Sequence, residues 1–304
     1  MKSLFISICG IPNAGKSTLF NALAGVKISA VSNKVQTTRN NIRGILTEED
    51  TQLVFIDTPG VFMPKKDLEK KIVSIAKKGI DQGALVCLVV DATRRLDEIT
   101  EGIIQKYKEK GDKIVIALNK IDQVNENRII PLIKQLYDED VVDELFVISA
   151  KTGRGLKDLK QYMLSKAQED HWYYDADDIT DRDNVFLCSE ITREQLFHVL
   201  QDELPYSIDV ETDDISYGEA TQNALLANGL PNPDAKVVKI AEIHQSVLVE
   251  RETQKKIIIG AKGERLKNIA KQATEEMESL LGCRVRLKLF VKDKKDWIYR
   301  WKGE

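Results

Sequence analysis

The 304-residue chain has few cysteines, few histidines and no long apolar run. Its four cysteines (Cys9, Cys87, Cys188 and Cys283) stand far apart, a spacing that fits neither a disulfide framework nor a metal site. The three histidines are equally scattered, which argues against a metal cage. No run reaches the roughly 18 apolar residues of a membrane span, and the apolar start is too short for a secretory signal. These absences favour a cytoplasmic protein with reduced thiols.

Charge is unevenly distributed along the chain. The net charge is −3, but residues 251–304 carry 15 Lys and Arg against 8 Asp and Glu, which leaves −10 for the remainder. A basic C-terminal segment on an acidic protein suggests a polyanion as the partner of that segment. A solvated charged surface would have the same composition, so charge alone does not decide.

Apolar strand-like runs alternate with helical patterns in the first half. Strands are expected at residues 4–9, 53–56, 84–90, 114–118 and 145–148, with helices such as 17–23, 70–82 and 130–137 between them. This alternation predicts βαβ units and therefore an α/β domain with a mainly parallel sheet. Ligands of such sheets bind at the carboxyl ends of the strands.

The second half has a different pattern. An acidic, turn-rich stretch at 171–183 predicts a linker, which places one domain at 1–170 and another at 184–304. The second domain is expected to be α+β, with a helix at 192–204, strands at 207–211 and 237–249, helices within 266–280 and a strand at 284–291. Its segment 213–235, with two glycines and two prolines, is expected to be a mobile loop or insertion.

A phosphate-binding motif follows the first expected strand. Residues 10–17 read GIPNAGKS and match G-x-x-x-x-G-K-[ST] in the required strand-to-helix context. Backbone N–H groups of such a loop surround phosphate oxygens, while Lys16 would neutralise the β and γ phosphates and Ser17 would bind Mg²⁺. The predicted contacts are Gly10, Ile11, Pro12, Asn13, Ala14, Gly15, Lys16, Ser17 and Thr18. This motif alone leaves an ATPase, a kinase and a GTPase open.

Three further motifs at strand ends decide between them. Residues 57–60 (Asp57, Thr58, Pro59 and Gly60) place a carboxylate for Mg²⁺ and a backbone N–H for the γ phosphate. Residues 119–122 contain Asn119, Lys120 and Asp122, and residues 149–151 are Ser149, Ala150 and Lys151. The Asp122 carboxylate can accept from guanine N1–H and N2–H₂, a donor pair that adenine lacks. The Ala150 N–H can reach guanine O6, so the predicted nucleotides are GTP and GDP with Mg²⁺.

The order of these motifs resembles the translation-factor-related GTPases. By this resemblance Gln36–Arg39 belongs to switch I, in which Thr38 binds Mg²⁺. The predicted catalytic residues are then Lys16, Thr38, Asp57 and Gly60.

Two positions bear on the rate of hydrolysis. Ras-like enzymes place a glutamine where this chain has Val61, and valine cannot orient a water molecule, so intrinsic turnover should be slow. Asn13 matches an asparagine that helps hold K⁺ in related GTPases, which implies K⁺-stimulated hydrolysis.

A second candidate site lies in the basic segment. Residues 257–263 (IIIGAKG) contain Gly-x-x-Gly before a helical pattern and resemble the RNA clamp of a KH module. A plain helix–helix turn has the same pattern, but the basic surroundings and the order α-β-β-α-α-β favour a type II KH domain. Residues 257–259 would form an apolar floor for bases. The RNA-binding residues implied are Ile259, Gly260, Ala261, Lys262, Gly263, Arg265 and Lys267.

A GTPase domain followed by a KH module resembles the Era family of bacterial GTPases over nearly the whole chain. Residues 189–194 and 203–206 are similar to the start of its KH domain, and residues 247–252 to the strand that enters the clamp. The resemblance implies binding to the 3′ end of small-subunit ribosomal RNA, a role in maturation of the small ribosomal subunit, and peripheral association with the inner face of the cell membrane. We expect a monomer. The segment 213–235 is longer than is usual in the family.

Two other interpretations stay open. A membrane-associated, GTP-dependent signalling or cell-cycle switch with an RNA-binding domain, or a GTP-dependent protein of tRNA modification, would share the first domain. A tRNA-modifying relative would carry a further catalytic domain. A passive RNA-binding protein with a degenerate nucleotide site would conflict with an intact set of residues, namely Lys16, Ser17, Asp57 and Asp122. Near the C-terminus, Trp297, Tyr299 and Trp301 would stack bases or seal the domain edge, and edge packing is favoured.

Overall fold

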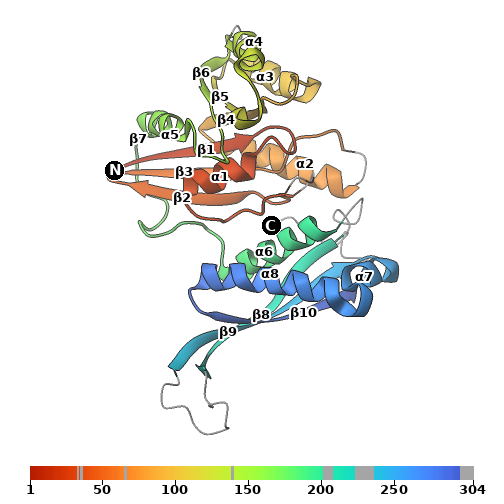
Figure 1. The fold of residues 1–304 in the computed structure, drawn as a ribbon. Helices are drawn as coiled ribbons and strands as arrows, with labels where there is room; N and C mark the ends of the chain where they lie inside the picture. Colours follow the sequence, from red (N-terminus) through yellow and green to blue (C-terminus); the bar gives the residue numbers. More distant parts are fainter. Residues whose placement is uncertain are drawn as a thin grey trace. The chain divides into compact units, whose positions relative to one another are not determined.

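The computed structural model describes residues 1–32, 34, 37–64, 67–137, 140–200, 208–222 and 236–294 (Figure 1). One unit contains Met1–Arg182, and a second begins at Asp183. No helix in the described part of the chain is long and apolar enough to cross a bilayer. Several residues discussed above lie outside the described residues, namely Gln36, residues 201–207, residues 223–235, Trp297, Tyr299 and Trp301.

The first unit is built on a seven-stranded sheet with parallel central strands. The strand order is β2 (Ile42–Glu48), β3 (Thr51–Asp57), β1 (Lys2–Cys9), β4 (Leu85–Asp91), β5 (Ile114–Asn119) and β6 (Val142–Val147). β2 runs antiparallel to β3, and the short β7 (Gln168–Glu169) runs antiparallel to β1. The prediction of an α/β fold with a mainly parallel sheet is confirmed, but β2 was missed.

A helix follows each of β1, β3, β4, β5 and β6 in the chain. These helices are α1 (Lys16–Ala24), α2 (Asp67–Ile80), α3 (Glu98–Lys110), α4 (Glu126–Tyr137) and α5 (Leu156–Ser165). β3, β4 and β5 are buried along their whole length, as expected of strands covered on both faces. One core cluster joins Leu88 and Leu118 of the sheet to Ile104 and Leu136 of α3 and α4. Burial raises the pKa of Cys9 to about 12, in keeping with a core thiol.

The second unit has the element order α-β-β-α-α-β. Its elements are α6 (Asn184–Val199), β8 (Ile208–Gln222), β9 (Lys236–Val249), α7 (Glu252–Ile259), the one-turn helix η3 (Ala261–Gly263), α8 (Glu264–Leu281) and β10 (Arg284–Asp293). β9 is central, antiparallel to β8 and parallel to β10. Apolar side chains of α6, α7 and α8 pack on the sheet in two clusters. This order confirms the predicted KH-type α+β fold.

The segment 213–235 is not a loop throughout. Asp213–Gln222 continues β8 and pairs with β9 out to Lys236, so the two strands run as a ribbon beyond Arg284, the first residue of β10 (Figure 1). A bulge near Asp213 interrupts the alternation of side chains, and Asp213 accepts from Ser246 across the strands. The expectation of a loop was wrong here because residues 214–222 pair with β9 as a strand. Residues 223–235 lie outside the described residues.

Residues 170–182, which we call the strap, lie along β2 and β3. The strap forms a bridge to the edge strand, where the Ile45 N–H donates to Ile179 O at 2.9 Å. Gln52 is fully buried, and its side chain accepts from the Tyr174 N–H at 3.1 Å and donates to Tyr174 O at 3.0 Å. The strap includes nearly all of the predicted acidic linker, 171–183, so in the structure that segment is hydrogen-bonded to the strands.

Candidate nucleotide and RNA sites

The predicted phosphate loop, Gly10–Ser17, connects the end of β1 to the first turn of α1. Its glycines adopt positive φ angles, 139° at Gly10 and 96° at Gly15. A Cβ on Gly10 would lie 2.5 Å from Val89 O, and one on Gly15 would overlap the Asn119 amide. Larger residues are therefore excluded at both positions. The loop curls around the start of α1, where N–H groups and the helix dipole attract an anion.

Oxygen atoms of Ser17, Thr38 and Asp57 meet beside this loop. Ser17 Oγ donates to Asp57 Oδ2 at 2.8 Å and lies 2.8 Å from Thr38 Oγ1, which is 3.3 Å from the same carboxylate oxygen. The other oxygen, Asp57 Oδ1, is buried and has no hydrogen-bond partner among the described residues. An unpartnered buried carboxylate oxygen is costly, and hydroxyl and carboxylate oxygens are the ligands that Mg²⁺ prefers. These residues fit the predicted Mg²⁺.

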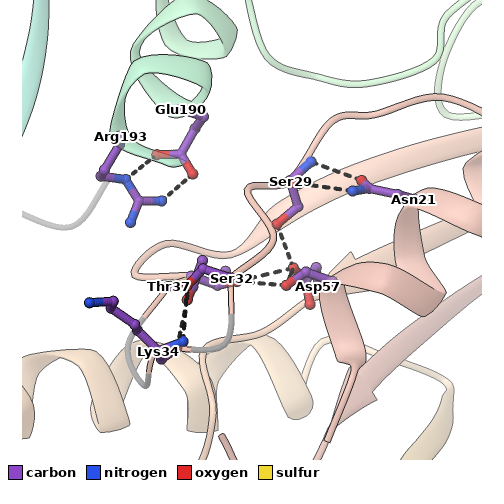
Figure 2. A network of polar contacts seen from close by, with 10 residues as sticks. Asn21, Ser29, Ser32, Lys34, Thr37, Asp57, Glu190 and Arg193 are labelled. Atoms are coloured by element: carbon purple, nitrogen blue, oxygen red, sulfur yellow. Dashed lines mark hydrogen bonds and ion pairs between the residues drawn. The ribbon is translucent and has the colours of Figure 1, made fainter. Parts of the chain in front are cut away.

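The two threonines of the predicted switch I have different partners. Thr37 Oγ1 donates to Lys34 O at 2.7 Å and lies 2.6 Å from Ser32 Oγ (Figure 2). Thr38 instead faces Asp57. The geometry agrees with the choice of the second threonine as the metal ligand, although that role stays a prediction.

Burial disfavours the charged forms of both Lys16 and Asp57. It lowers the pKa of Lys16 to about 8, an effect that the nearby Asp57 opposes. It raises the pKa of Asp57, while Lys16 and the Ser29, Ser17 and Thr38 hydroxyls act in the opposite direction. A phosphate and a divalent cation would each supply the counter-charge that this site calls for.

Gly60 and Val61 lie against the phosphate loop. A Cβ on Gly60 would lie 2.8 Å from Pro12 N, so only glycine fits there. The Val61 N–H donates to Gly10 O at 3.1 Å, and its side chain packs against the β4–β5 core. An apolar side chain turned to the core cannot hold a water molecule.

Asn119 joins the phosphate loop to the loop after β6. Its Nδ2 donates to Ala14 O at 2.9 Å, and its Oδ1 accepts from the Ala150 N–H at 2.9 Å. Asp122 accepts from Ser149 Oγ at 2.7 Å and stays exposed. The Ala150 N–H, predicted to contact guanine O6, is thus bound to Asn119 in the structure. A contact with O6 requires this bond to be shared or exchanged.

Two parts of the site were not predicted from the sequence. Ser29 Oγ donates to Asp57 Oδ2 at 2.8 Å, and Asn21 Oδ1 accepts from the Ser29 N–H at 2.9 Å (Figure 2). Asp91, the last residue of β4, accepts from Lys120 Nζ at 2.7 Å. Ser29 and Asn21 belong to no motif. Asp91 did carry a signal, since it is a lone carboxylate at the end of an apolar strand.

The Gly-x-x-Gly loop joins α7 to α8. Three of its residues have positive φ angles: 74° at Gly260, 51° at Lys262 and 79° at Gly263. A Cβ on Gly260 would lie 2.7 Å from Arg265 Cβ, whereas nothing lies within 4 Å of one on Gly263. The backbone is open at Gly263, which lets a nucleic-acid strand approach closely.

The side chains around this loop only partly match the prediction. The basic residues are exposed, namely Lys262, Arg265 and Lys267. Of the three isoleucines, Ile257 is 47% exposed, while Ile258 is fully buried and Ile259 packs against the core. The expectation of a three-residue apolar floor was wrong for Ile258, because the last turn of α7 directs that side chain to the sheet.

Comparisons with known proteins match both units. Residues 5–120 match the family model 50S ribosome-binding GTPase, and residues 226–298 match the KH domain. GTPase Era of Maricaulis maris (strain MCS10) is 37% identical over 97% of this chain and 93% of its own length. GTPase Era of Mesorhizobium japonicum is 38% identical over 96% of this chain and 89% of its own.

Two solved structures match along the whole chain. The crystal structure of Era in complex with MgGDPNP and nucleotides 1506–1542 of 16S ribosomal RNA is 34% identical, with a TM-score of 0.87 over 100% of this chain and 97% of that chain. A variant of Aquifex aeolicus Era bound to GDP and AlF4⁻ gives the same values. With relatives of this identity along nearly its full length, the protein belongs to the GTPase Era family.

Proposed function

We propose that this chain hydrolyses GTP, binds the 3′ end of small-subunit ribosomal RNA through its KH unit, and couples the two during assembly of the small ribosomal subunit. The observation that carries the enzymatic part is the buried Oδ1 of Asp57, which has no partner among the residues that the structure describes and lies beside the Ser17 and Thr38 hydroxyls. The RNA part rests on the KH fold and on a relative solved with nucleotides of 16S ribosomal RNA.

Each group at the phosphate end has its own task. Lys16 neutralises the β and γ phosphates, and the Gly60 N–H donates to a γ-phosphate oxygen. Ser17, Thr38 and Asp57 would hold Mg²⁺, since their oxygen atoms meet beside the phosphate loop. The metal ion supplies positive charge to the phosphates during transfer. The attacking water is not held by Val61, whose side chain packs in the core.

Guanine recognition rests on Asp122, and nucleotide preference tests it. GTP should bind well over 100-fold more tightly than ATP, because adenine leaves the carboxylate without its two donors. Asp122→Ala should lose that preference, while Asp112→Ala, at another exposed aspartate of the same unit, should keep it. A wild-type protein that prefers ATP, or an Asp122→Ala variant that still prefers GTP, would refute the proposal.

The RNA target can be identified by crosslinking. The chain with a non-hydrolysable GTP analogue would be crosslinked to total RNA, and the bound fragments sequenced. The 3′ end of small-subunit ribosomal RNA should be enriched, and Gly263→Asp should abolish this because it puts a negative charge where the backbone is open. Enrichment of tRNA, or no enrichment at all, would contradict the assignment.

Membrane association and a monomeric state are also proposals. The basic segment 251–304 would bind an anionic lipid surface as well as RNA. Co-sedimentation with vesicles containing anionic lipid, in physiological salt, would support a peripheral membrane role. Protein that stays in the supernatant would contradict the membrane role and leave RNA as the partner of this segment. Sedimentation velocity tests the monomer.

A further inference from the structure

Asp91 is a buried carboxylate next to the base side of the nucleotide site. It ends β4 and lies opposite Asn119 of β5 in the sheet. Its exposed fraction is 4%. A carboxylate so far from water persists as a charge only with strong partners.

Hydrogen bonds satisfy both oxygens of this carboxylate. Asp91 Oδ1 accepts from the Thr93 N–H at 2.9 Å and from Thr93 Oγ1 at 2.6 Å. Asp91 Oδ2 accepts from Lys120 Nζ at 2.7 Å and lies 3.7 Å from Arg94 Nε. Burial alone would raise the pKa of Asp91, but the bonds from Lys120 and Thr93 outweigh it and lower the pKa. Asp91 is therefore ionised at neutral pH.

Lys120 is the partner that connects Asp91 to the nucleotide site. It lines the hollow beside the phosphate loop. Its backbone has φ 67° and ψ 32°, a left-handed conformation that costs a residue with a Cβ some free energy. The preceding residue, Asn119, accepts through its carbonyl from the Ala92 N–H at 2.9 Å. The end of β4 thus holds both the backbone before Lys120 and its side-chain tip.

We infer that Asp91 is a positioning residue for nucleotide binding: it binds the Lys120 ammonium group and so fixes the lysine stem as a wall of the guanine nucleotide site. This inference rests on the proposed function. A free lysine side chain samples many rotamers and would lose that freedom when the nucleotide binds. The charge-assisted bond to Asp91 orders the side chain beforehand.

A double-mutant cycle tests this role. Release of a fluorescent GDP analogue would be timed for the wild type, Asp91→Asn, Lys120→Met and the double variant. Asp91→Asn keeps the size of the side chain and removes its charge, so release should become roughly 10-fold faster. In the Lys120→Met background the same change should add less than about 2-fold, because Asp91 acts through the lysine.

Two further measurements separate positioning from stability. Single-turnover hydrolysis at saturating GTP should change less than about 2-fold in Asp91→Asn, because Asp91 bonds Thr93 and Lys120 and so acts on nucleotide binding. Asp143→Asn, which breaks the 2.8 Å pair of Asp143 with Lys166 in the same unit, should leave GDP release unchanged. Thermal melting of each variant without nucleotide reports folding.

Equal acceleration by Asp91→Asn with and without Lys120 would overturn the inference, as would unchanged release in Asp91→Asn. A low melting temperature with release faster in both Asp91→Asn and Asp143→Asn would also overturn it in favour of a structural role. If the wild type does not bind the GDP analogue at all, the proposed function itself fails.

Discussion

Ser29 donates a 2.8 Å hydrogen bond to Asp57, and both side chains are buried. The same carboxylate oxygen, Asp57 Oδ2, also accepts from Ser17 and Thr38. Three hydroxyl groups therefore fix the orientation of the Asp57 carboxylate. Asn21 holds Ser29 in turn, since its Oδ1 accepts from the Ser29 N–H and its Nδ2 donates to Ser29 O. A residue outside every recognised motif therefore orients the predicted metal-binding carboxylate.

Replacing Ser29 by alanine should weaken the use of Mg²⁺. We expect Ser29→Ala to raise the Mg²⁺ concentration for half-maximal GTP hydrolysis by roughly 10-fold, because partners of metal-binding groups tune metal affinity. Steady-state hydrolysis across a Mg²⁺ titration measures this. Ser165→Ala, which removes a hydroxyl bonded to Tyr162 O on α5, is the matched control and should behave as the wild type. An unchanged Mg²⁺ requirement in Ser29→Ala would exclude this role.

The sequence predicts best where several signals agree. β4 and β5 are continuous apolar runs, and each ends on a polar residue at the sheet edge. β2 was missed because Ile42–Glu48 contains arginine, glycine and threonine and is an edge strand without an apolar run. The sheet class was therefore predictable, whereas its mixed edge was not.

The chemistry of single motifs was predictable, but the bonds between them were not. Spacing placed Asn119 near the base, yet its bonds to Ala14 and Ala150 depend on how three loops meet. Asp91 and Ser29 act through such bonds, and no local sequence pattern predicts bonds between distant segments. The bond between Asp213 and Ser246 was not predictable for the same reason, since Ser246 lies on another strand.

Potassium should accelerate hydrolysis through Asn13. We expect wild-type turnover to be at least about 10-fold faster in KCl than in NaCl, because the ion adds positive charge where charge develops. Asn13→Gly should lose this difference. Glycine is the suitable replacement because Asn13 has φ 64°, which glycine adopts without strain. Equal rates of the wild type in the two salts would refute the K⁺ hypothesis.

Charge reversal in the KH loop should weaken RNA binding without disturbing the fold. Lys262 is exposed, so Lys262→Glu should reduce affinity for the ribosomal 3′-end RNA by roughly 10-fold or more. The slope of log affinity against log salt concentration should become smaller by about one, because one phosphate contact is lost. Fluorescence anisotropy across a salt series measures both. Lys239→Glu, an identical change at an exposed position of β9, is the control. Equal losses in the two variants would show a general charge effect and no clamp.

Gln52 should couple the nucleotide site to the strap. It lies on β3, five residues before Asp57, and accepts from the Tyr173 N–H at 2.9 Å while bonding both backbone groups of Tyr174. Gln52→Ala removes the acceptor of the Tyr173 and Tyr174 N–H groups, so hydrogen exchange at these two amides should speed up by on the order of 10-fold. The strap leads directly into the RNA-binding unit. Loosening it should therefore reduce the effect of RNA on GTP hydrolysis and leave hydrolysis without RNA unchanged.

Hydrogen exchange and hydrolysis with and without RNA decide this together. Gln105→Ala, which removes an exposed amide bonded to Glu109 on α3, should change neither measurement. Unchanged exchange at Tyr173 and Tyr174 in Gln52→Ala would show that Gln52 does not hold the strap. Faster exchange with an undiminished RNA effect would show that the strap is held by Gln52 but that coupling takes another route. Only faster exchange together with a smaller RNA effect supports a strap that connects β3 to the RNA-binding unit.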